Sequence, residues 1–208
     1  MAAKGSGARE PWLGRALVQG AFAGIVAPLM VVFLVAMMSG WLRDLFREPT
    51  CDDPKDLALI TPSGVETRGN TVYSDADGAY PASNAIDTNS GTAWVEAAPG
   101  YGVGEWLRFS FDDRPDIQMV CVVNGYAQNA ARYELNGRVR QLDVTTDAGN
   151  RTAVLADLPL DEVATFQRLR PLPGRTATVT LTIRSTSSMG GSQAVADTAI
   201  SEVEFWGR

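Results

Sequence analysis

The chain has 208 residues, of which 45% are hydrophobic and 20% charged, which is enough for one full domain and an appendage but not for two large domains. It contains no histidine, so Ser-His-Asp triads, Cys-His dyads and His-ligated metal sites are excluded, and two cysteines are too few for a zinc ribbon. The net charge of −6 and the pI near 4.7 argue against nucleic-acid binding, which requires a basic surface to displace the counterions of the phosphates.

The first feature along the chain is a long apolar segment without a formal charge. It comprises the 27 residues 16–42, between Arg15 and Arg43, with Trp12 and Trp41 near its ends. Roughly 20 helical residues cross a ~30 Å hydrocarbon core, and tryptophan rings favour the headgroup level. We therefore expect a transmembrane helix over 16–42. A buried core helix and a cleaved signal peptide are the alternatives, but the segment is much longer than a signal-peptide apolar region of ~7–15 residues.

The charges beside this segment predict its orientation. Residues 1–15 carry a net charge of +2, whereas the charges of residues 43–48 cancel. Positive flanks favour the cytoplasmic side of a membrane. We expect residues 1–15 to form a cytoplasmic tail of a single-pass cell-membrane protein. Residues 49–208, with 13 Lys and Arg against 21 Asp and Glu, would then lie outside.

Residues 43–56 are predicted to form a short juxtamembrane stem, in which Pro49 and Pro54 end any helix. Cys51 lies in this stem, and Cys121 lies in an apolar run typical of a buried strand. An oxidising exterior would allow a disulfide between them. The sequence leaves open whether Cys51 instead stays free or pairs with a second chain, because it does not give the Cα separation on which a disulfide depends.

From about residue 57 apolar and polar residues alternate, which indicates β-strands. The clearest example is 176–184, where the apolar residues fall on one face and threonines on the other. Residues 138–146 show a change of phase that indicates a bulge. Other predicted strands lie at 66–74, 106–111, 117–126, 151–157, 163–169 and 202–207. No helical period of useful length is present, so we expect an all-β antiparallel sandwich or jelly roll over residues 57–208.

One loop of this domain is dense in oxygen-bearing side chains. Asn84, Asp87, Asn89 and Thr92 fall within nine residues and are followed by Trp94. Hard cations such as Ca²⁺ bind six to eight oxygens from carboxylates, carbonyls and hydroxyls, and a tight loop of this kind supplies several. The same composition is also typical of a solvated turn that holds no ion.

Several motifs in this region together resemble a known family. PASNAIDTNSGTAW, GEWLRFSF and AISEVEFWG resemble the discoidin or coagulation-factor type C domains, which have galactose-binding-like jelly-roll folds. More narrowly, GYGVGEW, VVNGYAQN, YELNGRVRQL and DTAISEVEFWG are similar to the NADase-type glycan-binding domain, a discoidin relative first named from a bacterial NAD glycohydrolase toxin. The resemblance covers roughly residues 60–208 and implies a discoidin-like β-sandwich behind the transmembrane helix.

The resemblance also implies a structural calcium site. In related jelly rolls a calcium ion holds the first loop against the last strand. The matching positions here would supply side-chain oxygens from Asp87, Thr92 and Glu202 and main-chain carbonyls from Asn84, Asn89 and Ser201. An ion at this place would close a loop of more than 100 residues, which restricts the unfolded chain strongly.

Members of this fold bind ligands through loops at one end of the sandwich, so the resemblance directs attention to loop aromatics. A sugar needs an aromatic ring for its C–H face and planar hydrogen-bonding groups for its hydroxyls. The candidate ligand-binding residues are Tyr101, Tyr126, Asn129, Arg132 and Tyr133. The alternative is that Tyr126 and Tyr133 cap the core and Arg132 is a solvated surface charge.

The predicted function is a membrane-anchored, extracytoplasmic carbohydrate-binding module that recognises a glycan such as cell-wall carbohydrate. The alternative is a structural or interaction protein whose sandwich docks onto another envelope protein. We do not expect an enzyme, because the NAD-cleaving part of the toxin has no counterpart here. The adjacent carboxylates Asp112-Asp113 and Asp161-Glu162 lie beside predicted turns, which is typical of solvated loop charges.

Overall fold

A computed structural model describes residues 31, 35, 47–187 and 196–208 of the chain. The chain divides into a unit of residues 1–48 and a compact unit of residues 49–208. The predicted cytoplasmic tail 1–15 and nearly all of the predicted transmembrane helix 16–42 lie outside the described residues. Within the described part of the chain, no helix has the length and hydropathy of a membrane span.

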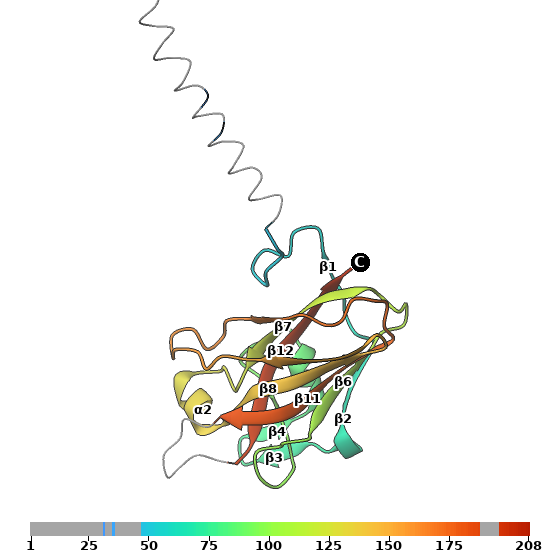
Figure 1. Ribbon diagram of the computed structural model, residues 1–208. Helices are drawn as coiled ribbons and strands as arrows, with labels where there is room; N and C mark the ends of the chain where they lie inside the picture. Colours follow the sequence, from blue (N-terminus) through green and yellow to red (C-terminus); the bar gives the residue numbers. More distant parts are fainter. Residues whose placement is uncertain (1–30, 32–34, 36–46, 188–195) are drawn as a thin grey trace, which may run out of the picture. The chain divides into compact units, whose positions relative to one another are not determined.

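The compact unit is a two-layered β-sandwich, as the alternation predicted (Figure 1). One layer has the strand order β9-β8-β11-β6-β2, and the other contains β10, β7 and β12 with the short strands β1 and β5 beside β12. The two layers join through a short parallel contact of β12 with β8, in which Thr198 pairs with Gly137. All other pairings are antiparallel apart from a single bridge between Gly125 and Ile200.

The strands of the first layer are β2 (Gly64–Thr67), β6 (Trp106–Ser110), β8 (Gly137–Thr146), β9 (Gly149–Val154) and β11 (Thr178–Ser187). Those of the second layer are β1 (Ala58–Leu59), β5 (Trp94–Val95), β7 (Ile117–Asn124), β10 (Gln167–Leu169) and β12 (Thr198–Gly207). A separate hairpin is formed by β3 (Tyr73–Asp75) and β4 (Gly78–Tyr80). The helical elements of this unit are η1 (Arg68–Asn70), η2 (Ala82–Ile86) and α2 (Ala130–Leu135).

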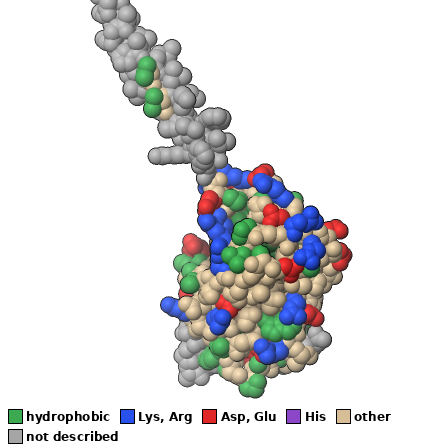
Figure 2. All heavy atoms as spheres, turned by 45° about the vertical axis from the view of Figure 1, so that its right-hand side comes forward, with side chains coloured by type: hydrophobic (Ala, Val, Ile, Leu, Met, Phe, Trp, Pro, Cys, Tyr) green, Lys and Arg blue, Asp and Glu red, His purple; other side chains and the backbone are tan. Residues whose placement is uncertain are grey.

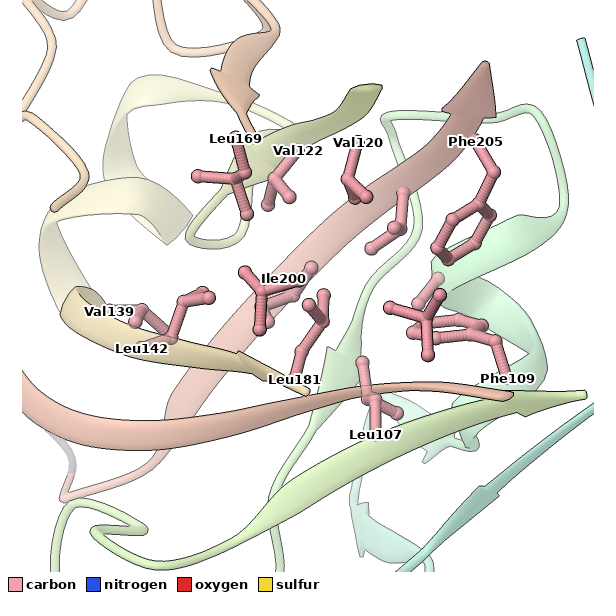
Figure 3. Packing of buried hydrophobic residues seen from close by; sticks show 14 of the residues in the cluster. Leu107, Phe109, Val120, Val122, Val139, Leu142, Leu169, Leu181, Ile200 and Phe205 are labelled. Carbon is pink, nitrogen blue, oxygen red and sulfur yellow. The ribbon is translucent and has the colours of Figure 1, made fainter. Parts of the chain in front are cut away.

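The core lies between the two layers, where apolar side chains of facing strands meet (Figure 3). On β11, Val179 and Leu181 are buried. The alternating residues Thr178, Thr180 and Thr182 face outward and are half-buried. Phe109 of β6 and Phe205 of β12 pack with ring centroids 4.8 Å apart. Each such ring contributes about 1.5–3 kcal/mol through removal of apolar surface from water, so the alternating pattern holds the layers together.

The predicted bulge is confirmed, and it explains how Val139, which is out of phase with Leu142 and Val144, still faces the core. Val139, Leu142 and Val144 of β8 are all buried. The pairing of β8 with β11 shifts register on either side of Ser185, which is opposite Gln141. The local irregularity turns Val139 back to the core side.

The domain contains a short α-helix, α2, in a segment whose sequence shows no helical period. The Asn129 side-chain oxygen accepts a hydrogen bond from the main-chain N–H of Arg132 at 2.9 Å and caps the first turn. A helix of six residues is too short to show a hydrophobic period. The expected strand at 66–74 is interrupted, because η1 separates β2 from β3.

Part of the predicted stem is attached to the sandwich. Cys51 and Cys121 form a disulfide with Cα atoms 5.9 Å apart, which closes a separation of 70 residues. The disulfide packs in a small apolar cluster that includes Leu57 and Met119. The carboxylate of Asp56 also pairs with Arg208 near the C-terminus. Residues 49–56 therefore belong to the folded unit.

Charged side chains are mixed on the surface of this unit. On the face seen in Figure 2, basic side chains lie beside acidic ones.

Candidate functional site

The loop between η2 and β5 meets the last strand, as the resemblance implied. The main-chain N–H of Asn89 donates to Asp87 Oδ1 and to Glu202 Oε2, both at 3.0 Å. Thr92 Oγ1 lies 2.7 Å from Asp87 Oδ2 and 2.8 Å from the Asn89 carbonyl oxygen. We call this set (Asp87, Asn89, Thr92 and Glu202) the clasp. It joins residues that are 113 positions apart in the chain.

The clasp has unusual electrostatics because its central carboxylate is buried. Glu202 is only 4% exposed. Burial, opposed by the hydrogen bond from Asn89 and aided by the charge of Asp87, raises its pKa to about 7. Among the described residues, no lysine or arginine forms an ion pair with Asp87 or Glu202.

The donor set of the clasp fits a hard cation. It combines two carboxylates, a hydroxyl and a main-chain carbonyl, which are the ligand types that Ca²⁺ prefers. The described residues contain no group of three or more His, Cys, Asp or Glu that could hold a metal ion. A calcium site does not need one, because carbonyl and hydroxyl oxygens complete its coordination.

The other two predicted metal ligands have side chains that face elsewhere. The Asn84 side-chain amide donates to the Ala93 carbonyl at 2.9 Å. The Ser201 hydroxyl accepts from the N–H of Ala127 at 2.9 Å and lies 3.0 Å from the Gly125 carbonyl. Both side chains fix neighbouring loops, which is consistent with a prediction that used only their main-chain carbonyls.

A second cluster lies at the end of the sandwich away from the C-terminus, between the β3–β4 hairpin and the start of α2 (Figure 1). The rings of Tyr73 and Tyr80 have centroids 5.8 Å apart, and Tyr80 meets Tyr126 edge to face, also at 5.8 Å. The Arg132 guanidinium lies 5.6 Å from the Tyr126 ring centroid and pairs with Asp77 of the hairpin. We call these five residues the tyrosine pocket.

The hydroxyls of two of these tyrosines are bound to carboxylates. The Tyr80 hydroxyl donates to Asp75 Oδ1 at 3.0 Å. Burial and this carboxylate raise the pKa of Tyr80 to about 12. Burial and a hydrogen bond to Asp197 likewise raise the pKa of Tyr73. Both tyrosines therefore stay protonated and keep their O–H groups as donors to these carboxylates.

Two cavities adjoin at the tyrosine pocket. The larger one has a volume of about 320 Å³ and is lined by Tyr80, Tyr126, Arg132 and Asp77, together with Asn84 and Thr92 of the loop that forms the clasp. The smaller one, of about 40 Å³, shares Tyr80, Tyr126 and Arg132 and reaches Tyr73, Asp75 and Asp197. The larger volume is at the lower end of the range for small-molecule sites, about 300–1,000 Å³.

The structure separates the predicted ligand-binding residues. Tyr126 and Arg132 come together in the tyrosine pocket. Asn129 caps α2, and Tyr133 is fully buried with its hydroxyl accepting from the N–H of Leu158 at 3.2 Å. Tyr101 lies on another loop, where its carbonyl accepts from the Thr198 hydroxyl. These last three residues do not line either cavity.

The sequence reasoning missed the hairpin that supplies half of the pocket. Tyr73, Asp75, Asp77 and Tyr80 lie within YSDADGAY, where an Asp-Gly pair between two aromatic residues is a hairpin signal. The predicted strand at 66–74 included Tyr73 and the residue after it, so the turn between β3 and β4 was not predicted.

A larger cavity, of about 470 Å³, lies elsewhere, next to Arg208. It is lined by apolar residues such as Phe111 and by Asp112, Asp113 and Arg175. The Arg175 guanidinium is already bound to the carbonyls of Asp113 and Arg114. Phe111 is the one aromatic residue among the described residues that line this cavity, whereas three tyrosines line the two cavities of the tyrosine pocket, so we favour the tyrosine pocket as the binding site despite its smaller volume.

The fold and these positions agree with a comparison against family models. The NAD glycohydrolase translocation F5/8 type C domain matches residues 62–206, so the chain belongs to this discoidin-like family. A search of curated proteins found no significant match.

Several solved structures are similar to this sandwich. The CBM32-1 and CBM32-2 domains of Clostridium perfringens ZmpB in complex with GalNAc align with a TM-score of 0.51 and 10% identity, over 71% of this chain and 33% of that one. The arabinofuranosyltransferase AftD from Mycobacteria (mutant R1389S) gives 0.47 and 21%, over 74% and 12%. The family 32 CBM of C. perfringens NanJ in complex with galactose gives 0.46 and 15%, over 72% and 98%. The chain thus spans about a third of the ZmpB chain and an eighth of AftD.

Proposed function

We propose that the protein is a membrane-anchored, extracytoplasmic carbohydrate-binding module that recognises a glycan without catalysing a reaction. The observation that carries this proposal is the tyrosine pocket, a cavity with aromatic and planar cationic groups on a discoidin-like sandwich. Recognition by one such pocket is weak, and tethering to a surface would raise the effective concentration of the glycan.

The chemistry of the pocket suits a sugar. Tyr126 supplies an apolar ring next to the cavity, and Arg132 supplies a planar set of N–H donors for hydroxyl groups. The related fold in ZmpB was solved with GalNAc bound, which supports a hexose-sized ligand for this family of sandwiches.

Calcium fits the proposal as a structural element. Asp87, Glu202, Thr92 and the Asn89 carbonyl would hold the ion, which would supply positive charge between two carboxylates. The clasp loop also contributes Thr92 to the larger cavity, so fixing this loop would fix one wall of the binding site.

Anchoring and export rest on the sequence and on the disulfide. The uncharged segment 16–42 has the length of a membrane span, and its flanking charges favour a cytoplasmic N-terminus. The Cys51–Cys121 disulfide is typical of proteins in an oxidising compartment, which supports an extracytoplasmic domain.

The absence of a catalytic role is supported by where the paired carboxylates lie. Asp112 and Asp113 are exposed in the loop after β6, and Asp161 and Glu162 are exposed in the loop between β9 and β10. None of the four lines either cavity of the tyrosine pocket.

The alternative, docking onto an envelope protein, would use the 470 Å³ cavity beside Arg208. Among the described residues, the carboxylates of Asp112 and Asp113 in this cavity make no ion pair. A partner with a basic side chain would meet them.

A glycan array and a cell-wall pull-down with the full-length protein in detergent test the proposal. The double variant Asp77→Ala/Arg132→Ala removes both halves of the pocket ion pair, so it leaves no uncompensated charge. It should abolish retention of the glycans that the natural protein binds. The matched control is Arg114→Ala/Asp147→Ala, which removes an ion pair of 2.8 Å outside the pocket. Equal retention by both variants, or no glycan bound by the natural protein, would overturn the function proposed for this pocket and favour docking.

A further inference from the structure

The tyrosine pocket presents many hydrogen-bond acceptors and few donors. The Tyr80 hydroxyl donates its proton to Asp75, and the Tyr73 hydroxyl is bound to Asp197. Their oxygens therefore face a ligand only as acceptors, beside the carboxylates themselves. A ligand in this pocket must bring donors.

The amide groups at the rim do not correct this imbalance. The Asn84 side chain donates to the Ala93 carbonyl, and the Asn136 side chain donates to the Arg132 carbonyl at 2.9 Å. Arg132 itself directs one nitrogen at Asp77. The guanidinium, the Tyr126 hydroxyl and the exposed Gln128 are the remaining donors among the described side chains that line the two cavities, against three carboxylates.

The charges point in the same direction. Asp75, Asp77 and Asp197 line the two cavities, while Arg132 is the one cation among their described lining residues. The pKa of Asp75 is lowered by hydrogen bonds from Asp77, Tyr80 and Gly78, in spite of its desolvation, so this carboxylate is ionised at neutral pH. The lining has three negative charges against one positive charge.

We infer that the ligand carries an ammonium group: the pocket is built for an amino sugar whose amine is not acetylated. This inference rests on the proposed glycan-binding function. The sugar ring occupies the cavity of about 320 Å³, and the ammonium group faces Asp75 and Asp197 in the cavity of about 40 Å³. An ammonium group brings three donors and one positive charge, which meets both deficits, whereas a sugar acid brings more acceptors and is repelled.

Titration calorimetry with the full-length protein in detergent tests this with four methyl glycosides of the same ring: the neutral hexoside, the 2-amino-2-deoxy analogue, its N-acetyl derivative and the uronide. Each set is used in the gluco and the galacto configuration. We expect the amine to bind roughly tenfold more tightly than the neutral sugar at low salt and the uronide to bind most weakly. The preference for the amine should shrink at about 0.5 M NaCl because exposed charges are screened.

Two variants locate the preference. Asp197→Asn and Asp75→Asn should each reduce the affinity for the amine more than the affinity for the neutral sugar, so that the preference for the amine shrinks. Asp197 lies outside the hairpin, so its variant remains informative if Asp75→Asn disturbs the β3–β4 turn. Asp112→Asn, in the loop after β6 at the cavity beside Arg208, is the matched control and should change nothing.

The possible results separate the two proposals. Equal binding of the amine and the neutral sugar overturns the inference and leaves carbohydrate binding intact. No binding of any glycoside overturns the proposed function as well. Binding of N-acetyl-lysine methylamide as tightly as the amino sugar would show that the pocket recognises an ammonium group without a sugar ring, which also overturns the inference.

Discussion

The clasp and the tyrosine pocket share the loop that contains Thr92, yet they are held together in opposite ways. In the clasp, a buried carboxylate of β12 meets a main-chain N–H from a loop 113 residues earlier. In the pocket, the polar contact between hairpin and helix is an ion pair whose Asp77 side chain is 63% exposed. Buried contacts between distant segments contribute to folding stability, whereas exposed ion pairs contribute little. The two regions should therefore respond differently to substitution.

The largest expected effect is the loss of the cation from the clasp. At a calcium concentration 100 times its Kd, binding stabilises the folded protein by about 2.7 kcal/mol. Asp87→Ala should remove this stabilisation and lower the Tm in calcium by about 5–11 °C, given about 2–4 °C per kcal/mol for a chain of this size. Thermal melts with calcium and with EDTA measure it.

The matched control for this variant is Asp77→Ala, which removes an exposed carboxylate from the hairpin. Its Tm should respond to EDTA as that of the natural protein does. If Asp87→Ala keeps the natural Tm and the natural response to EDTA, the clasp holds no cation and its comparison with the pocket fails.

A smaller effect is expected from Glu96. Like Glu202 it is a buried carboxylate that accepts hydrogen bonds from main-chain N–H groups, but it lies outside the clasp. Glu96 is 1% exposed and accepts hydrogen bonds from the N–H groups of Ala98 and Thr198. Burial, opposed by these two hydrogen bonds and aided by the charges of Asp197 and Glu105, raises its pKa to about 7. The folded protein thus binds a proton here that the unfolded chain releases near pH 4.5.

Stability from Glu96 should therefore fall as the pH rises from about 4.5 to about 7 and then level off. The expected loss is on the order of 2 kcal/mol over this window. Glu96→Gln does not titrate, so the Tm of this variant relative to the natural protein should rise with pH across the same window. Melts from pH 5 to 8 in EDTA measure the difference. A difference that stays constant with pH would mean that Glu96 titrates at its ordinary value.

The sequence predicted the clasp better than the pocket because of how each is encoded. The ligands of the clasp loop lie within nine residues, and the family resemblance implied that Glu202 of the last strand meets this loop. The alternating strands predicted the core, since one face of each strand must be buried.

The pocket could be predicted only in part. Its aromatic side chains come from a hairpin and from the start of a helix, both too short to show a period. Tyr126 and Tyr133 are equally aromatic in the sequence, yet Tyr126 lines the cavity while Tyr133, on α2, is fully buried. The turn of the six-residue helix decides this, and it depends on the Asn129 cap. Arg132 was found because a guanidinium in a polar aromatic segment is a common ligand contact.

The smallest change in stability is expected from Arg132→Ala. Unlike Asp87→Ala, it should weaken glycan binding much more than it lowers the Tm. The guanidinium lies by Tyr126 and pairs with Asp77, and its side chain is 26% exposed. Its removal should weaken glycan binding about tenfold, or about 1.4 kcal/mol, because hydrogen bonds from a charged group to the ligand are lost. The Tm should move by less than about 2 °C, because Asp77 is left exposed to water and no buried charge loses its partner. Calorimetry with the best glycan from the array and thermal melts of the same samples measure both quantities.

The control is Arg114→Ala, which breaks the exposed pair with Asp147 and should alter neither glycan binding nor the Tm. If Arg132→Ala instead lowers the Tm as much as Asp87→Ala does, the pocket is part of the stabilising framework and the contrast between the two regions is wrong.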